Sequence, residues 1–144
     1  MNRKGFTLVE IMIVVAIVAL LAAIAIPGLL RARVNANESS AQSTLKTIAT
    51  GCESYASGNN GNYPDTMARM TGAVPPYLTS QFDTMDTAPL VTNGYSFDCG
   101  TIGATGYSCT ATPSGCIAGT VTSGTGTKTY TITTGAVMTS ADCT

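Results

Sequence analysis

An uninterrupted apolar run near the N-terminus is the feature that most limits how this chain can fold. Residues 11–30 carry no charge, and residues 11–26 are all Ile, Met, Val, Ala or Leu. At ~1.5 Å rise per residue, a helix of about 20 such residues spans the ~30 Å apolar core of a bilayer. One small domain cannot hide a helix that is apolar on every face. The run therefore predicts a segment that lipid or other chains must cover.

The residues ahead of this run form a distinct pattern. Arg3 and Lys4 precede Gly5 and Phe6, and Glu10 lies inside the apolar segment. A carboxylate in the membrane costs ~3 kcal/mol or more, so Glu10 indicates a function that needs a partner. The two basic residues favour a cytoplasmic N-terminus and an exported C-terminal part.

This arrangement resembles the class III signal of type IV prepilins and type II secretion pseudopilins over residues 3–34. The resemblance implies that a prepilin peptidase cuts between Gly5 and Phe6 and N-methylates Phe6, while the apolar helix is kept. It also implies that an inner-membrane assembly platform adds the subunit to a helical homopolymer. Glu10 would then neutralise the free amine of a neighbouring subunit and set the axial register, because a slip would bury both charges unpaired.

Pro27 and Gly28 interrupt the apolar run near its end. Proline in a helix interior costs ~3 kcal/mol because it removes a hydrogen bond and clashes with the preceding turn, and glycine adds about 1 kcal/mol. A fixed kink is the simplest structural expectation. The family resemblance instead implies that residues 19–27 can lose helical structure when the subunit enters the filament.

Other interpretations of the N-terminus compete with this one. A secretory signal peptide would be cut after Ala23-Ile24-Ala25, giving a mature chain that starts at Ile26. Glu10 within the apolar region and Pro27 just beyond the cut argue against that interpretation. A plain membrane anchor explains the length of the run but not the Gly5-Phe6 and Glu10 pattern.

Composition excludes several functional classes. The chain has 144 residues, a net charge of −1, no histidine and no tryptophan. The absence of histidine removes His-based triads and most transition-metal sites, and there is no nucleophile-elbow or phosphate-loop motif. The charge is not basic enough to attract nucleic acid. We therefore expect no enzyme activity and no nucleic-acid binding.

Five cysteines in an exported chain indicate disulfides. None of them forms a C-x-x-C pair, and any four allow three connectivities. We favour Cys99 with Cys109 and Cys116 with Cys143, which leaves Cys52 unpaired.

The remaining sequence predicts an α+β, type IV pilin-like fold, in which one long helix packs on a small antiparallel sheet. An apolar stripe from Val34 to Tyr55, with members 3 or 4 residues apart from Ala41 onward, continues the helix to a Gly58–Gly61 turn cluster. Alternating residues predict strands, among them residues 128–133, with a hairpin turn at 133–136 and a surface loop at 114–127. The expected order is a leader (1–5), a membrane and filament-core helix (6–30), an amphipathic half (31–57), a connecting loop with a short helix near 64–70 (58–93) and the sheet (94–144).

Two further motifs carry weaker expectations. Asp83, Asp86 and Asp98 are candidate calcium ligands, as in the calcium-binding loop of major pseudopilins, but their spacing matches no EF-hand. Solvated loop charges are the simpler interpretation, so we expect no cofactor or metal. The Asn37-Glu38-Ser39 triplet fits a glycosylation acceptor, but it falls within the predicted helix.

The resemblance implies a type IV pilus subunit that is stored in the inner membrane and then assembled into an extracellular filament. The alternatives are a major pseudopilin of a type II secretion system and, outside the family, a secreted disulfide-bonded binding protein. The sequence does not separate motility, adhesion, DNA uptake, secretion and electron transfer, nor a major from a minor subunit.

Overall fold

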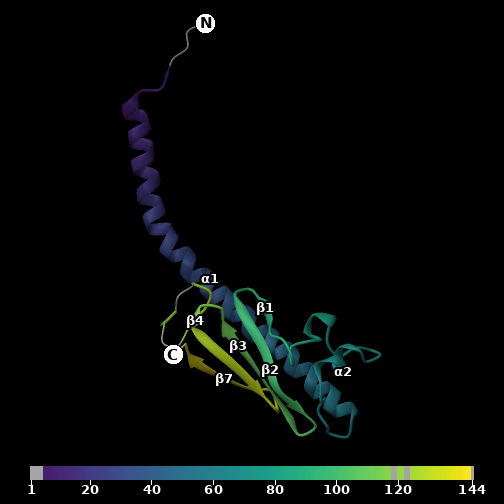
Figure 1. Ribbon diagram of the computed structural model, residues 1–144. Coiled ribbons are helices and arrows are strands. Elements are labelled where there is room, and N and C mark those ends of the chain that lie inside the picture. The colour runs from purple at the N-terminus through teal and green to yellow at the C-terminus, as the bar shows by residue number, and fades with distance from the viewer. Residues whose placement is uncertain (1–4, 118–119, 122–123, 144) are drawn as a thin grey trace.

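One helix runs through about a third of the chain and organises the rest of it (Figure 1). The computed structural model describes residues 5–117, 120–121 and 124–143. Helix α1 extends from Leu8 to Gly58, a length of 51 residues. Its first half projects away from the folded domain, and its second half lies along a sheet. The predicted single helix of about 50 residues is confirmed.

Local backbone chemistry fixes where α1 ends. The backbone N–H groups of Asn59 and Gly61 both donate to the carbonyl of Ala56, and Asn60 and Gly61 have φ values of 57° and 83°. Glycine and asparagine tolerate this left-handed conformation better than other residues. The turn cluster therefore stops the helix where the sequence predicts.

Five antiparallel strands form the sheet that packs on α1, in the order β1-β2-β3-β6-β7. They are Leu90–Thr92 (β1), Tyr95–Gly103 (β2), Gly106–Pro113 (β3), Lys128–Thr133 (β6) and Val137–Asp142 (β7). This architecture confirms the predicted α+β fold.

Two tight turns set the register of the outer strands. Asn93 and Gly94 have φ values of 50° and 75°, as a two-residue hairpin turn requires. Strand β1 therefore lies at the end of the 58–93 segment and extends the sheet beyond the strands predicted from the sequence. The predicted hairpin turn at 133–136 is confirmed, because Thr133 pairs with Val137.

The segment predicted as a surface loop, residues 114–127, contains a second, smaller sheet. Cys116–Ile117 (β4) pairs antiparallel with Thr120–Val121 (β5). Residues 118–119 and 122–123 lie outside the described part of the chain. The segment thus carries a short hairpin where the sequence indicated only a loop.

The core lies between one face of α1 and the inner face of the sheet. Ala41, Leu45, Ile48 and Cys52 of the predicted stripe are buried, and each large apolar side chain removed from water stabilises the fold by ~1.5–3 kcal/mol. Alternate residues of three strands face them, as the period of two requires. The buried strand residues are Tyr95, Phe97, Cys99, Tyr107, Cys109, Ala111, Tyr130 and Ile132.

The connecting segment covers the remaining end of this core. It contains α2 (Met67–Thr71), which confirms a short helix in this region, and a 3-10 turn, η1 (Ser80–Phe82). Gly51 of α1 permits the close approach, because a Cβ there would lie 2.7 Å from side-chain carbons of Leu78. The segment's buried apolar residues are Met67, Met70, Leu78, Phe82 and Met85.

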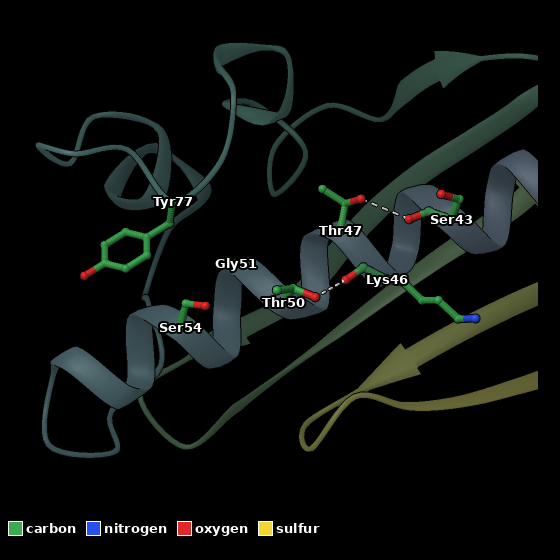
Figure 2. A pocket seen from close by; sticks show the side chains of 7 residues that line it. All are labelled: Ser43, Lys46, Thr47, Thr50, Gly51, Ser54 and Tyr77. Carbon is green, nitrogen blue, oxygen red and sulfur yellow. Dashed lines mark hydrogen bonds between the residues drawn. The ribbon is translucent and has the colours of Figure 1, made fainter.

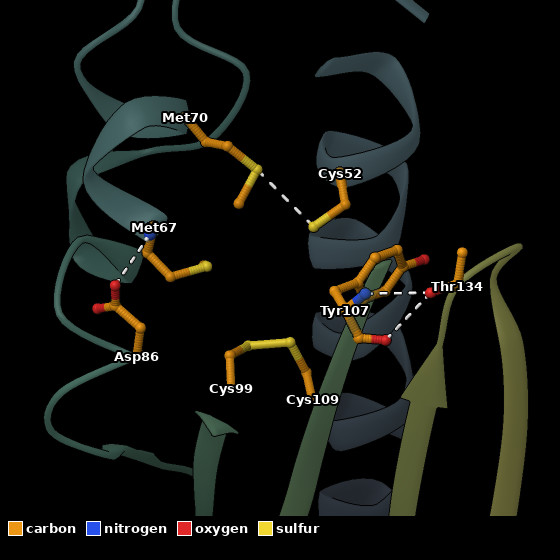
Figure 3. Close-up of a disulfide and its surroundings, with 8 residues drawn as sticks. All are labelled: Cys52, Met67, Met70, Asp86, Cys99, Tyr107, Cys109 and Thr134. Atoms are coloured by element: carbon orange, nitrogen blue, oxygen red, sulfur yellow. Dashed lines mark hydrogen bonds between the residues drawn. A yellow bond between two sulfur atoms is a disulfide. The ribbon is translucent and has the colours of Figure 1, made fainter. Parts of the chain in front are cut away.

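Two disulfides tie neighbouring segments together. Cys99–Cys109 links β2 to β3 within the core, beside Cys52 and Met67 (Figure 3). The second disulfide links Cys116 of β4 to Cys143, the residue after β7. Both pairings confirm the expected connectivity.

The thiol of Cys52 remains free and buried, as expected. Its sulfur lies 3.7 Å from the sulfur of Met70 (Figure 3). Burial, together with the nearby charge of Glu53, raises the pKa of this thiol to about 12. Cys52 therefore behaves as a small apolar core residue, not as a reactive thiol.

Two carboxylates of α1 pin the helix to the sheet. The first, Glu53, accepts hydrogen bonds from the hydroxyl of Tyr63 (2.9 Å), the hydroxyl of Tyr107 (3.1 Å) and the backbone N–H of Gly135 (2.8 Å). Burial and the bond to Glu53 raise the pKa of Tyr107. One side chain thus joins α1 to the connecting segment, to β3 and to the β6–β7 turn.

The second carboxylate, Glu38, lies nearer the point where α1 leaves the domain. Its Oε1 accepts from the backbone N–H (2.8 Å) and the hydroxyl (2.7 Å) of Thr127, and its Oε2 accepts from the hydroxyl of Tyr130 (3.3 Å). Burial acts to raise the pKa of Glu38, but these bonds and the charge of Lys128 outweigh it and lower that pKa. The adjacent Asn37 amide donates to the carbonyl of Thr125 at 2.9 Å.

The substitution Glu53→Gln is expected to lower the free energy of unfolding by about 1–3 kcal/mol, because an amide nitrogen cannot accept the bonds that a carboxylate oxygen accepts. Urea unfolding of the full chain in detergent, followed by circular dichroism, measures this. Asp98→Asn is the matched control, since Asp98 is exposed on the outer face of β2. Equal effects of the two substitutions would contradict the pinning role of Glu53.

Stability should also depend on pH through Glu38. Its pKa in the folded chain lies below its ordinary value of 4.5. Its contribution is therefore complete above pH 4.5 and is lost as the pH falls through the folded pKa. The difference in unfolding free energy between wild type and Glu38→Gln should accordingly shrink on acidification. A difference that stays constant with pH would show that the Glu38 charge contributes nothing.

Candidate assembly site on the N-terminal helix

The start of α1 is closed by a reciprocal pair of hydrogen bonds. The hydroxyl of Thr7, the N-cap, accepts from the backbone N–H of Glu10 at 3.3 Å. The Glu10 carboxylate in turn accepts from the backbone N–H and the hydroxyl of Thr7, both at 2.8 Å. This capping box satisfies helix N–H groups that would otherwise lack partners. In the uncut chain, Glu10 is therefore occupied by its own helix start.

The predicted cleavage site lies just outside this capped turn. Gly5 and Phe6 are exposed and precede the helix, and Phe6 retains 86% of its accessible surface. Arg3 and Lys4 lie outside the described residues. A cut between Gly5 and Phe6 would leave Thr7 and Glu10 in place, so the mature helix would keep its cap.

Within the described part of the chain, the apolar half of α1 forms no core. Its side chains from Leu8 to Leu30 are at least half exposed at every large apolar position, for example Ile24 at 72% and Leu29 at 70%. By length and composition, this is one helix that can cross a membrane. So much exposed apolar surface marks a membrane or protein interaction surface.

An apolar groove borders Glu10 on this surface. The lining residues are Phe6, Glu10, Ile11, Ile13 and Val14. A carboxylate in such surroundings attracts a cation more strongly than one in open water does, because the local dielectric constant is lower once the groove is covered. The arrangement can hold a single positive group against apolar neighbours.

Pro27 and Gly28 lie within this exposed half, and α1 is continuous through both. Proline has no N–H to donate to the preceding turn, so the helix has one hydrogen bond fewer at this point. A Cβ on Gly28 would meet nothing within 4 Å. Gly28 is therefore not required by close packing inside this chain, and loss of helix over 19–27 stays a prediction.

A second groove lies on the polar face of α1, beside Tyr77 (Figure 2). Two of its hydroxyl groups are used locally: Thr47 donates to the carbonyl of Ser43 at 3.1 Å, and Thr50 donates to that of Lys46 at 2.8 Å. None of the residues that line this groove is a carboxylate or a histidine. Its lining consists of Ser43, Lys46, Thr47, Thr50, Gly51, Ser54 and Tyr77.

The three candidate calcium ligands make separate contacts. Asp83 accepts from the hydroxyl of Thr71 at 2.5 Å, and Asp86 accepts from the backbone N–H of Met67 at 3.2 Å. Asp98 lies on the outer face of β2. Within the described ranges, no group of three or more Cys, Asp or Glu side chains is placed to hold a metal. The structure does not bring these aspartates into one site.

Sequence reasoning missed the pinning roles of Glu38 and Glu53. Each lies beside the apolar stripe of α1, and its partners are distant in sequence, such as Thr127 and Tyr107. The capping box was also missed, although Thr7 and Glu10 show its Thr-x-x-Glu spacing directly before an apolar run. That local signal could have been found.

Comparison with known proteins finds a family motif and similar pilins. Residues 1–26 match the family described as the prokaryotic N-terminal methylation motif. The chain is 48% identical over 59 residues to the type IV wide pilus major component PilA4 of Thermus thermophilus. This match covers 41% of this chain and 45% of that protein. The chain is also 46% identical over 56 residues to the type IV major pilin protein PilA of Myxococcus xanthus, covering 39% of this chain and 26% of that protein.

The matched segments thus span less than half the length of either curated relative. They fall in a chain whose fold is one long helix on an antiparallel sheet. Over these segments the chain is similar to type IV major pilins, and its N-terminal residues carry the methylation motif.

Proposed function

We propose that this chain is a structural subunit of a type IV pilus filament. The second half of α1, the connecting segment and the sheet form a head domain that already has its own core. The observation that carries the proposal is the exposed apolar half of α1 beside this head domain. A surface of this kind needs cover that the described residues do not supply. Lipid covers it in the inner membrane, and neighbouring copies of the same helix cover it in the filament.

Processing converts the stored form into the assembling form. A prepilin peptidase cuts between Gly5 and Phe6 and methylates the amine of Phe6, and an inner-membrane platform then adds the subunit to the filament. The exposure of Gly5 and Phe6 ahead of the helix supports access by such an enzyme. In this role the chain needs neither a cofactor nor a catalytic residue of its own.

Glu10 supplies the electrostatic contact of assembly. Cleavage places a positive amine at the positive end of the α1 dipole, which is an unfavourable position for it. The Glu10 carboxylate of an adjacent subunit neutralises that amine, and the apolar groove around Glu10 excludes water from the pair. The cost of burying either charge alone fixes the axial position of one subunit against the next. Head-to-tail contacts of this kind do not close, so they generate a filament.

The mass of the protein in sheared cell-surface material tests this proposal. The expected chain starts at Phe6 and is heavier by one methyl group, because the peptidase both cuts and methylates. Top-down fragmentation of the intact chain locates the methyl group on the Phe6 amine and shows whether both disulfides are present.

Other outcomes of this experiment would contradict the proposal in different ways. A chain that starts at Ile26 would indicate a secreted protein released by an ordinary signal peptidase. A processed and methylated chain that stays in the membrane fraction, with no surface filament, would favour a pseudopilin. Cells that lack the peptidase provide the control, since only the uncut chain should accumulate in them.

A further inference from the structure

Arg31 lies where the apolar stretch of α1 ends. At ~1.5 Å per residue, the helix from Leu8 to Leu30 is about 35 Å long, enough to cross the ~30 Å apolar core of a bilayer with some tilt. When the start of α1 lies at the cytoplasmic face, Arg31 reaches the headgroups of the opposite leaflet. Arg33 follows two residues later, and both side chains are exposed.

A groove opens at this level, between α1 and the start of β6. One side of this groove is held in place, because the Thr127 N–H and hydroxyl donate to Glu38 at 2.8 Å and 2.7 Å. The lining is mainly apolar and continues the apolar surface of the span. It consists of Leu30, Arg31, Val34, Asn35 and Thr127.

The charges around the groove leave Arg31 available. Glu38, which contacts the groove at Thr127, accepts hydrogen bonds from Thr127 and Tyr130. The ion pair found among the residues that the structure describes joins Arg69 to Asp65. Both residues lie in the distant connecting segment. An exposed guanidinium at headgroup depth is well suited to a phosphate, which it can bind with two parallel hydrogen bonds.

We propose that this groove binds an anionic phospholipid of the outer leaflet while the precursor is stored in the membrane. Arg31 takes the phosphate, and Leu30 and Val34 contact the upper part of an acyl chain. The inference rests on the proposed membrane-stored precursor. It explains why arginines lie at the exported end of the span, where the orientation rule alone does not favour them.

Native mass spectrometry of the full-length precursor tests this assignment. The protein is reconstituted in phosphatidylcholine with a minor fraction of phosphatidylglycerol, and the phosphatidylglycerol molecules retained per chain are counted. Arg31→Gln should lower retention about fivefold, the effect of one arginine at an anionic membrane surface. Val34→Ser, which keeps the charge, should also lower retention by removing acyl contact.

Two matched substitutions separate a groove from simple surface charge. Arg33→Gln removes the same charge at nearly the same depth but outside the groove lining, so it should lower retention less than Arg31→Gln does. Lys46→Gln removes a cation further along α1 and should change nothing. Equal losses for Arg31→Gln and Arg33→Gln, or an unchanged Val34→Ser, would overturn the groove.

The source of the phosphate and the underlying proposal are distinguished separately. Competition by inorganic phosphate as effective as that by phosphatidylglycerol would overturn the lipid assignment. Retention of a second copy of the chain in place of lipid would also overturn it. Failure of the wild-type precursor to float with phosphatidylcholine vesicles would contradict the membrane-stored precursor itself, whereas flotation without a preference for phosphatidylglycerol would overturn this inference alone.

Discussion

The structure depends on one continuous helix whose two halves need different surroundings. From Leu8 to Leu30, α1 is exposed within the chain and apolar on every face. From Ala41 to Ala56, one face is buried against a sheet and a connecting segment. Because the two halves share one continuous helix, whatever covers the first half also influences where the head domain lies. A lipid bilayer and a bundle of like helices both offer that surface an apolar environment, which is what the proposed transfer of one subunit from membrane to filament requires.

Such a transfer requires that the head stay fixed to its helix. Apolar burial holds the domain together, but it is not directional. Glu53 and Glu38 add direction, since each binds backbone or hydroxyl groups from elements far apart in sequence. The disulfide Cys99–Cys109 joins two neighbouring strands of the sheet, and Cys116–Cys143 joins β4 to the end of β7. A pull on the head is therefore transmitted to α1 through contacts at several levels of the helix.

Much of this architecture follows from local sequence patterns. The period of the stripe from Ala41 to Cys52 predicted the buried face of α1, and alternation predicted Lys128–Thr133 as a strand with its bounds unchanged. The two disulfides were also expected. The Asn93-Gly94 hairpin was missed although its signal is local and strong, so the strand before it was missed too. The short β4–β5 pair lacks an apolar pattern long enough to reveal it.

The candidate site divides in the same way. Glu10 stands out because a charge within an apolar run is rare. Gly5 and Phe6 stand out by their place between the basic pair and that run. Glu38 and Glu53 do not stand out, because a carboxylate on a helix is ordinary unless its partners are known. Those partners come from β3, from β6 and the residue before it, from the β6–β7 turn and from the connecting segment, and only the folded chain brings them to the helix.

In the proposed filament, Glu10 of one subunit neutralises the Phe6 amine of another. Solid-state NMR of filaments assembled from two subunit populations, one with ¹⁵N-labelled phenylalanine and the other with ¹³C-labelled glutamate, tests it most directly. A cross-peak between the Phe6 amine nitrogen and the Glu10 carboxylate carbon in such mixed filaments is the predicted result, because that contact can form only between chains. Its absence there, with a cross-peak only in doubly labelled chains diluted by unlabelled ones, would show that each subunit neutralises its own terminus and would contradict the account.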